Sequence, residues 1–425
     1  MSESSESEAK KLSEQEEFLR IIQQLSDATT SDKVKAKKTQ GDHAFWNTQP
    51  VPKIDEYPGE HEAIKPNRDV TQVRSQPYAM PQGFEWVVID LTDDTQTQEV
   101  YQLLTENYVE DDGNTFRFDY SIDFLRWALL VPGYNTEWHI GVRNEKTNKL
   151  MAFISGIPAR VRVYQHYLDV AEINFLCVHK KLRTKRLAPV LIKELTRRVN
   201  LKNVWQAVYT AGVILPMPVS QCRYFHRSLN PKKLVEVGFS RLPNHMTMSG
   251  LIKGYKLPSA PLTCGLRLME RKDVPQVTNM LRKYLEQFHL TPVMEEKDVE
   301  HLLLPRKGVV SSYVVEKSES DKITDFCSFY HLPSSIIGHE KHKKLNAVYS
   351  FYNVATSMTL TNLMHDALIM AKQEDFDVFN ALSLMNNAEI FKELRFCPGD
   401  GDLRYYLFNW RCPRMASDKV GLVLC

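Results

Sequence analysis

An apolar run that leads into a basic loop and then into a helix constrains the fold of this chain more than any other feature. Residues 172–178, Glu-Ile-Asn-Phe-Leu-Cys-Val, have the composition of a buried strand. The loop at 179–186 carries five lysine and arginine side chains, and residues 187–199 place apolar side chains at helical spacing. Backbone N–H groups at a helix start attract phosphate. The segment predicts an α/β unit that binds a pyrophosphate, although an ordinary basic surface loop fits the loop residues equally well.

Strand and helix patterns alternate along most of the remaining chain. They predict a helix at 98–108, a hairpin of strands 138–143 and 150–157, and further strands at 161–168 and 204–209. Similar elements recur after about residue 230, with helices expected at 273–288 and 361–373 and strands at 311–316, 324–331, 347–354, 376–381 and 403–410. The similar order suggests a duplicated α/β unit, although the two stretches show no repeat residue by residue.

Composition excludes several classes of protein. A chain of 425 residues with 43% hydrophobic and 25% charged residues is typical of a soluble globular protein with two domains or two fused halves. The net charge of +2 gives no indication of a nucleic-acid binder. Seven cysteines without a CxxC pair indicate reduced thiols and a cytoplasmic protein. We find no signal peptide and no apolar run near the roughly 20 residues of a membrane span.

The first 40 residues differ in composition from the rest of the chain. Ser, Glu and Lys dominate residues 1–40, and only the stretch 13–25 has the pattern of a marginal helix. We expect a flexible N-terminal tail here, and an association of this tail with ribosomes is left open. The ordered chain is expected to begin near His43 and to continue as a Pro-rich surface strap at 50–81.

Several longer motifs are diagnostic together. They are Phe45-Trp-Asn-Thr-Gln-Pro-Val51, Glu172-Ile-Asn-Phe-Leu-Cys-Val-His179, Lys185-Arg-Leu-Ala-Pro-Val190, Tyr209-Thr-Ala-Gly212, Tyr224-Phe-His-Arg-Ser-Leu-Asn-Pro231 and the terminus from Gly399 to Cys425. In these motifs the chain resembles the N-myristoyltransferase (glycylpeptide N-tetradecanoyltransferase) family, from about His43 to the last residue.

The resemblance implies a fold and a division of labour. The fold is α/β, with two fused acetyltransferase-like halves related by pseudo-twofold symmetry and a mixed twisted sheet flanked by helices. Residues 41–220 would bind myristoyl-CoA, the acyl donor. Residues 221–425 would bind much of the peptide and supply a catalytic C-terminus. The expected activity is transfer of myristate to the N-terminal glycine amine of other proteins, and we expect the enzyme to act as a monomer.

The resemblance also assigns residues to the acyl-CoA site. The loop 183–188, Arg-Thr-Lys-Arg-Leu-Ala, keeps the first and last positions of the acyl-CoA loop of acetyltransferase-like proteins, whereas Arg186 replaces the usual glycine. Thr184 stands where serine is common. The residues implied in acyl-CoA binding are His43, Ala44, Phe45, Trp46, Leu176, Cys177, Val178, Arg183, Thr184, Lys185, Arg186, Leu187, Ala188 and Pro189.

The reaction needs a base, because an α-amine with a pKa near 8 is mostly protonated at neutral pH. Neither a Ser-His-Asp nor a Cys-His arrangement is evident in the sequence. In the family the base is the C-terminal carboxylate, and the apolar tail 420–425 fits a buried chain end. The resemblance places the oxyanion hole at the backbone N–H groups of Phe175 and Leu176, and it places Asn174 and Thr210 near the incoming amine. A terminal Cys425, where relatives carry leucine or glutamine, leaves the carboxylate chemistry intact.

The acidic segment 108–118 resembles a loop of the peptide groove in the family. Carboxylates in this loop would attract a basic residue of the substrate, and Gly113, where many relatives carry an acid, predicts a weaker preference. A solvated acidic turn is the alternative interpretation of the acids alone. For His226, the alternative is a core histidine with a satisfied neighbour. The residues implied in peptide binding are Asp111, Asp112, Phe116, Phe118, Tyr120, Tyr224, His226, Asp400 and Gly401.

Two other functions and one other kind of site fit parts of the sequence. An N-acetyltransferase of the same architecture would share the phosphate loop but need no pocket for a long acyl chain. A non-catalytic acyl-CoA or peptide-binding protein would keep both grooves and lose the base. His339 and His342 have the spacing of metal ligands on a helix, but their charged context predicts a solvated hairpin tip, and we expect no metal.

Overall fold

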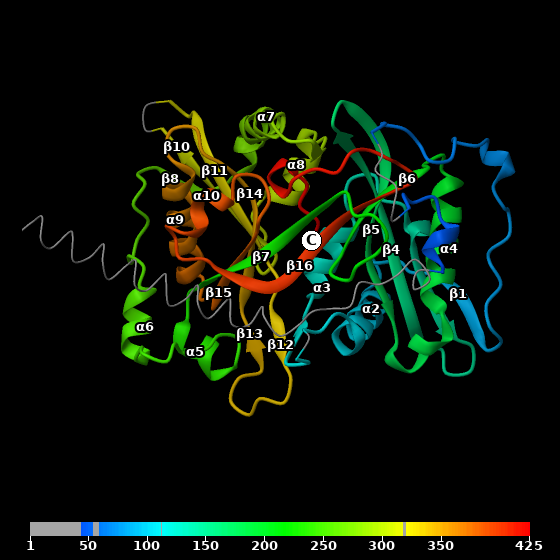
Figure 1. The fold of residues 1–425 in the computed structure, drawn as a ribbon, viewed down its shortest axis with the longest axis horizontal. Coiled ribbons are helices and arrows are strands. Elements are labelled where there is room, and N and C mark those ends of the chain that lie inside the picture. Colours follow the sequence, from blue (N-terminus) through cyan, green and yellow to red (C-terminus); the bar gives the residue numbers. More distant parts are fainter. Residues whose placement is uncertain (1–43, 54–58, 112, 318–319) are drawn as a thin grey trace, which may run out of the picture.

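The computed structural model describes residues 44–53, 59–111, 113–317 and 320–425. The expected N-terminal tail and two of the implied site residues, His43 and Asp112, therefore lie outside the described residues. A single mixed sheet of 13 strands extends across the molecule, with helices packed on it (Figure 1). The α/β class and the flanked mixed sheet expected from the sequence are confirmed.

The large sheet has one continuous strand order. Its strands, in spatial order, are β1 (Phe84–Val88), β3 (His139–Asn144), β4 (Leu150–Val163), β5 (His166–Val178), β6 (Gln206–Ala211), β16 (Cys397–Phe408), β7 (Ser220–Ser228), β15 (Val378–Leu382), β14 (Ala347–Val354), β11 (Ile323–His331), β10 (Val310–Glu316) and β8 (Leu266–Leu268), with β9 (Leu290–Pro292) paired to β4. A small second sheet contains β2 (Phe116–Phe118), β12 (Ser334–Ile336) and β13 (Lys344–Leu345).

The order of elements repeats along the chain. Both halves run from an edge strand through two helices and two antiparallel strands to a parallel pair joined by a helix. The parallel pairs are β5 with β6 and β14 with β15. The helices of the first half are α2 (Asp94–Asn107), α3 (Ile122–Leu129) and α4 (Leu187–Asn200), and those of the second are α7 (Val274–Leu285), α8 (Glu296–Leu303) and α9 (Leu360–Gln373), with α5 (Pro231–Glu236), α6 (Met248–Gly254) and α10 (Ala388–Phe391) outside this order.

The two halves exchange their last strands. β7 follows β6 in the chain but pairs with β15, whereas β16 follows β15 and pairs with β6. β7 and β16 also pair with each other at the centre of the sheet. The chain that leaves β16 therefore enters the first half again, and this places the last residues between the two halves.

Apolar faces decide which helices cover which side of the sheet. The largest core cluster contains buried side chains of α2, α3, α7 and α8 together with the last residues of the chain. The buried side chains of α4 and α9 belong to two separate core clusters, which contain other residues of the strands. Local signals set the helix starts: the side chain of Asp93 accepts the N–H of Gln96 at α2, and Thr359 accepts that of Asn362 at α9.

The structure corrects some expected boundaries. The expected strand at 161–168 is wrong, because β4 continues to Val163 and a two-residue turn leads into β5 at His166. The last strand begins earlier than expected, at Cys397, and is irregular between Pro398 and Asp402. The hairpin of β3 and β4 and the helix after the basic loop are confirmed.

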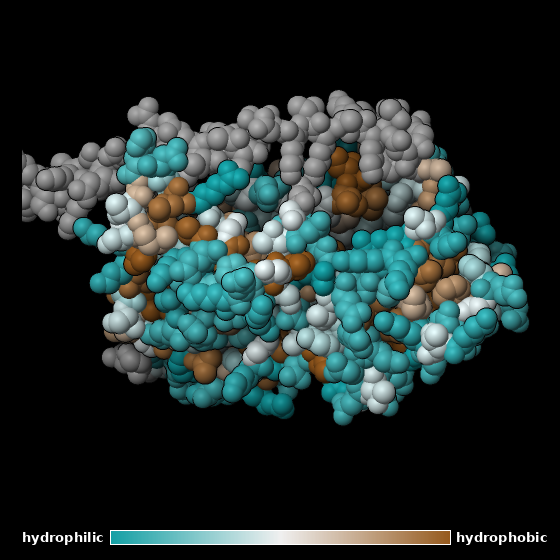
Figure 2. All heavy atoms as spheres, turned by 90° about the horizontal axis from the view of Figure 1, so that it is seen from below, coloured by the Kyte–Doolittle hydropathy of each residue, from teal (hydrophilic) through white to brown (hydrophobic). Residues whose placement is uncertain are grey.

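The surface shown in Figure 2 is mixed in hydropathy. Figure 2 shows one face on which hydrophilic residues predominate and hydrophobic residues form separate patches. Within the described part of the chain, no helix has the length and apolar character needed to cross a membrane.

Candidate active site

The last six residues are built into the core. Val420 and Leu422 to Leu424 are buried, and Figure 1 marks the C-terminus near the middle of the molecule, beside β16. Gly421 N–H donates to the carbonyl of Leu290 at 2.8 Å, and the hydroxyl of Tyr405 donates to the carbonyl of Leu422 at 2.7 Å. A Cβ on Gly421 would lie 2.9 Å from the ring of Phe288, so the segment is closely packed. The chain end is thus fixed inside the protein.

The terminal residue meets β5 at the residue that the motif places near the amine. The Nδ2 of Asn174 donates a short hydrogen bond to the backbone oxygen of Cys425. The hydroxyl of Ser155 on β4 donates to the carbonyl of Asn174 at 2.9 Å and holds this part of β5 in place. Val423 N–H donates to the hydroxyl of Tyr352 at 3.2 Å. A carboxylate is therefore held beside the strand that precedes the basic loop.

Directly after Asn174, β5 contains a bulge. Phe153 pairs with Cys177 and Ser155 with Asn174, so Ile154 of β4 faces both Phe175 and Leu176. Phe175 has a φ of 54°, in the left-handed region that costs a non-glycine residue about 1–2 kcal/mol. Its N–H donates to Oδ1 of Asn174 at 2.9 Å. The bulge thus turns backbone amides away from the regular ladder, next to the terminal carboxylate.

Thr210 lies on the neighbouring strand. β6 runs parallel to β5, with Val208 beside Glu172, and Thr210 of β6 pairs with Tyr405 of β16. Thr210 is half-buried. The structure therefore brings Asn174, Phe175, Leu176, Thr210 and Cys425 into one region, as the sequence motifs indicated.

The thiol of Cys425 does not compete with its carboxylate. Burial and the nearby carboxyl of Glu172 raise the pKa of this thiol well above its ordinary value. A neutral thiol is a poor base and a poor nucleophile. The carboxylate is the charge that the terminal residue brings to the centre.

The basic loop has the geometry of a phosphate site. Residues Lys180–Lys185 form a 3₁₀ turn, and Arg186, with φ 55° and ψ 37°, precedes α4 in a left-handed conformation. Among the described residues, no side chain caps the start of α4, whereas Asp93, Ser121 and Thr359 cap α2, α3 and α9. The first N–H groups of α4 are left for a ligand. Residues 183–186 are exposed around it, and Leu187, Ala188 and Pro189 form its first turn.

The aromatic residues of the first motif pack beside β6 and the core cluster of α4. Trp46 stacks on Tyr209 of β6 at 5.7 Å, and Phe45 contacts Trp46 edge-on at 5.2 Å. Trp46, Leu176 and Val178 all pack against the core cluster that contains the buried face of α4. Cys177 points to the other side of the strand and is buried, and Ala44 is exposed at the start of the described chain. The implied acyl-CoA residues thus converge on β5, β6 and α4.

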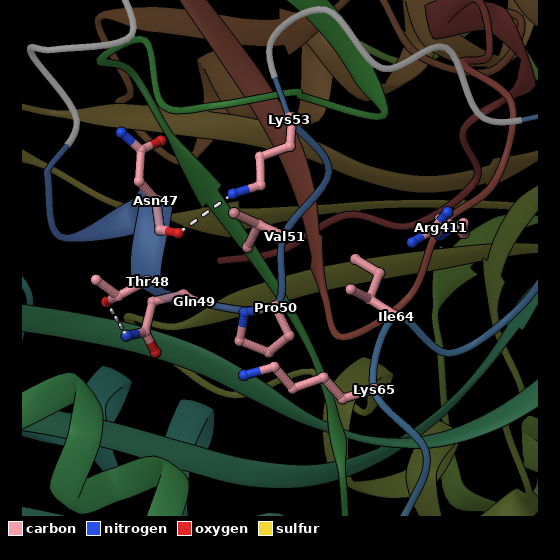
Figure 3. Close-up of a pocket in the computed structure, with 9 residues that line it drawn as sticks. All are labelled: Asn47, Thr48, Gln49, Pro50, Val51, Lys53, Ile64, Lys65 and Arg411. Atoms are coloured by element: carbon pink, nitrogen blue, oxygen red, sulfur yellow. Dashed lines mark hydrogen bonds between the residues drawn. The ribbon is translucent and has the colours of Figure 1, made fainter.

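A separate pocket lies behind the aromatic motif. Figure 3 shows residues 47–51 and Lys53 on one side and Ile64, Lys65 and Arg411 on the other. Lys53 donates to the carbonyl of Asn47 at 3.3 Å, and Arg411 lies 3.6 Å from a carboxylate oxygen of Glu62. None of the described residues implied in catalysis or peptide binding lines this pocket, so we do not assign the reaction centre to it.

The carboxylate of Asp111 binds backbone N–H groups of the acidic loop. Asp111 accepts the N–H groups of Thr115 and Phe116 at 2.7 Å each, so its carboxylate holds the loop closed. Glu110, which the sequence analysis did not select, accepts from Lys180 at 2.6 Å and from Arg117 at 2.7 Å. The acidic loop is therefore tied directly to the basic loop.

An aromatic wall continues from this loop to the chain end. Phe118 lies 5.9 Å from Tyr120, and Tyr120 lies 5.0 Å edge-on to Phe175. Tyr224 of β7 contacts Tyr349 at 6.2 Å. Burial raises the pKa of both Tyr120 and Tyr224, and Cys425 lies within electrostatic reach of both hydroxyls. The wall leads from the acidic loop toward the terminal residue.

His226 marks the other end of the wall. Its Nδ1 lies 2.6 Å from Oδ1 of Asn380, and its ring meets Phe239 edge-on at 5.2 Å. Burial lowers the pKa of His226, so the ring is neutral near pH 7. Phe116 contacts the same Phe239 at 5.7 Å. A Cβ on Gly399 would lie 2.3 Å from Nε2 of His226, so glycine is needed where β16 passes this ring. Asp400, exposed, and Gly401 follow it.

Comparisons with known proteins decide the family. The N-terminal domain model of myristoyl-CoA:protein N-myristoyltransferases matches residues 63–222, and the C-terminal domain model matches residues 236–423.

The chain belongs to the N-myristoyltransferase family.

Individual N-myristoyltransferases are similar over nearly the whole chain. Glycylpeptide N-tetradecanoyltransferase 1 of Arabidopsis thaliana is 57% identical over 90% of this chain and 89% of its own length. Glycylpeptide N-tetradecanoyltransferase 2 of Danio rerio is 53% identical over 96% and 82%. A crystal structure of Saccharomyces cerevisiae N-myristoyltransferase with bound myristoyl-CoA covers 91% of this chain and all of the yeast chain, with 41% identity and a TM-score of 0.88. The chain is thus an acyltransferase.

Sequence reasoning missed several residues of this N-myristoyltransferase. Tyr352 and Tyr405 bind the terminal segment, Tyr349 and Phe239 form part of the aromatic wall, and Asn380 contacts His226. Alternation along the expected strand at 347–354 could have indicated Tyr349, but its partners are distant in sequence. No group of three His, Cys, Asp or Glu side chains suited to a metal ion occurs among the described residues.

Proposed function

We propose that this enzyme transfers myristate from myristoyl-CoA to the α-amine of an N-terminal glycine by direct attack, with the Cys425 carboxylate as the base. The observation that supports this most is the buried chain end, held by Asn174 beside the bulge at Phe175. A thioester is activated already, so no covalent enzyme intermediate is needed. The division into an acyl-CoA half at 41–220 and a peptide half at 221–425 belongs to the same proposal, as do the monomeric state and the cytoplasmic location.

The proposed reaction follows the charges of the site. The carboxylate removes a proton from the glycine ammonium, and the amine attacks the thioester carbonyl. The oxyanion that forms accepts from the N–H groups of Phe175 and Leu176, and it competes with Asn174 Oδ1 for the first of them. The nitrogen loses its second proton as the C–S bond breaks. The departing CoA sulfur takes up one proton, and the other leaves to solvent.

The direct test uses a peptide that starts with glycine. Incubation with myristoyl-CoA is expected to add one myristoyl group to this peptide, whereas the same peptide with alanine first stays unmodified. Mass spectrometry measures both. Burial of each CH₂ group contributes about 0.8 kcal/mol, so myristoyl-CoA is expected to exclude acetyl-CoA in competition. Acetylation in the mixture would favour an N-acetyltransferase, and binding without any product would favour a non-catalytic binding protein.

The contact between the basic and acidic loops supports ordered binding, with acyl-CoA before peptide. Lys180 Nζ lies 2.6 Å from Glu110, and Lys180 N–H donates to Oδ1 of Asn107 at 3.0 Å. A pyrophosphate at the basic loop would compete with Glu110 for Lys180. Glu110, at the entrance of the peptide loop, would then keep Arg117 but lose Lys180, and its carboxylate would attract a basic substrate residue more strongly.

Glu110→Gln is therefore expected to reduce the effect of acyl-CoA on peptide affinity. In the unmodified enzyme, a non-hydrolysable myristoyl-CoA analogue should tighten peptide binding by about 10-fold, within the usual range of coupling between sites. In the variant the gain should fall to about 2-fold. Titration calorimetry of the peptide with and without the analogue measures both values.

Glu106→Gln is the matched control, because Glu106 is half-exposed in the last turn of α2, four residues before Glu110, and lies 3.9 Å from Lys149. It should leave the coupling unchanged. Equal peptide affinity with and without the analogue in the unmodified enzyme would contradict ordered binding itself.

A further inference from the structure

Glu172 is a half-buried acid that the proposed reaction does not yet use. It lies on β5 two residues before Asn174, so both side chains point to the same face of the strand. On the two neighbouring strands it pairs with Ile157 and with Val208. Val208 is in turn two residues before Thr210, which therefore shares this face. Glu172 thus belongs to the surface against which the terminal residue packs.

This carboxyl differs from the other interior acids of the molecule. Glu194 is held by Arg197 and Arg198, and Asp273 by Arg267. For Glu172, in contrast, no cation and no hydrogen-bond donor is found among the described residues, and the side chain is half-buried. Interior carboxylates are normally paired, because an unpaired charge away from water is costly. Burial accordingly raises the pKa of Glu172 to about 7.

Among the described ionisable groups near Glu172, the carboxyl of Cys425 is the one that can exchange a proton with it. From β14, Tyr352 lies within electrostatic reach of both Glu172 and Cys425. From the terminal segment come the thiol and the carboxylate of Cys425. The pKa values of the Tyr352 hydroxyl and the Cys425 thiol are raised far above neutrality, so both stay protonated. Two neighbouring carboxylates repel each other, so each makes the other more basic.

The reaction needs either a second proton acceptor or a terminal carboxylate that has given up its first proton. A glycine ammonium becomes an amide nitrogen with one hydrogen, so two protons leave the nitrogen in each turnover. A carboxylate that has taken the first proton is no longer a base for the second. We propose that Glu172 is a positioning residue of the reaction, which takes the first proton over from the Cys425 carboxyl and so returns it to the basic form. This inference rests on the proposed role of the chain end.

Each of the two protons that leave the glycine nitrogen then has a defined path. The terminal carboxylate accepts the first proton and passes it to the Glu172 carboxylate. The regenerated terminal carboxylate accepts the second proton as the C–S bond breaks. One of the two protons goes to the CoA thiolate, which becomes the free thiol, and the other returns to solvent before the next cycle. Because Glu172 must be ionised to take the proton, its contribution is expected only above about pH 7.

Glu172→Gln keeps the shape of the side chain and removes this exchange. Single-turnover rates at saturating myristoyl-CoA and peptide, measured from pH 6 to pH 9, report the chemical step. At pH 8.5 the variant is expected to be about 10- to 30-fold slower than the unmodified enzyme, and at pH 6 within about 2-fold, consistent with general acid–base contributions. The limb with an apparent pKa near 7 should disappear. Glu172→Asp, which keeps a carboxyl, should retain this limb.

Asp169→Asn is the matched control, because Asp169 lies on the same strand but is exposed and paired only loosely with Arg160, at 3.6 Å. Its pH profile should be unchanged. Thermal unfolding checks the fold: the raised pKa of Glu172 means that the native state loses stability as pH rises from about 4.5 to 7. Glu172→Gln should lack that loss and be more stable than the unmodified enzyme at pH 8.

A loss of equal size at every pH, or no loss at pH 8.5, would overturn the role of Glu172. The base itself is tested separately by extending the chain beyond Cys425. If that extension abolishes turnover while Glu172→Gln has no effect, the proposed function stands and this inference falls. If the extension has no effect, the proposed base falls first.

Discussion

Adding three residues after Cys425 is expected to lower kcat by about a thousandfold, with myristoyl-CoA affinity changed by less than about twofold. The extension replaces the carboxylate with a peptide bond, which cannot accept a proton from the glycine ammonium. It also forces additional chain into a site where Val420 to Leu424 are packed and fixed by Tyr405 and Tyr352. The acyl-CoA loop at 183–188 and the start of α4 do not depend on the chain end.

Steady-state kinetics with a glycine-starting peptide give kcat, and calorimetry gives the affinity for myristoyl-CoA. The same three residues added before Met1 serve as the control and should leave kcat unchanged. An extended protein with normal kcat would show that the base lies elsewhere. A loss of both kcat and acyl-CoA affinity would indicate a disturbed fold rather than a lost base.

The second large effect is expected from Asn174→Asp, which should slow the chemical step by about a hundredfold. The aspartate can still accept the N–H of Phe175 through one oxygen, as Asn174 does at 2.9 Å. It cannot donate to Cys425, and it places a like charge where Nδ2 now binds the terminal residue. A lost hydrogen bond to a charged group is worth about 1.5–3 kcal/mol, and about 2.7 kcal/mol corresponds to a hundredfold change in rate.

Single-turnover measurements with saturating substrates isolate this step. Asn144→Asp, at the end of β3, is the control: Asn144 accepts backbone N–H groups of its own turn through Oδ1, and an aspartate can do the same. A rate for Asn174→Asp close to that of the unmodified enzyme would mean that the contact with Cys425 does not position the base.

Elements with a strong local pattern were predicted well from the sequence. The helix expected at 187–199 is α4, Leu187–Asn200, because its apolar stripe and the basic loop before it are both local signals. The turn between β4 and β5 was missed, because neither Tyr164 nor Gln165 is a usual turn residue. Tyr164 adopts a φ of 53° although it is not glycine. β7 was not recognised as a strand, because its polar and apolar residues do not alternate regularly.

The candidate site likewise contains residues that motifs indicated and residues that only the structure revealed. Family motifs indicated Asn174, Phe175, Thr210 and Cys425, and the structure brings them together. Motifs gave no indication of Glu172 as a reactive group, because its raised pKa depends on burial by residues distant in sequence. Tyr352 and Tyr405 were likewise invisible, since their partners lie in the terminal segment.

The sequence by itself determined the local elements and the residues that can carry acyl-transfer chemistry, because amphipathic spacing and motifs act over neighbouring positions. Only the tertiary structure decided where the C-terminal residue lies in the folded protein. Asn174 and Cys425 are 251 positions apart, and they meet because the two halves exchange β7 and β16, which leads the last residues back to β5. Contacts of this kind depend on sheet order and burial across the whole chain, and no local pattern encodes them.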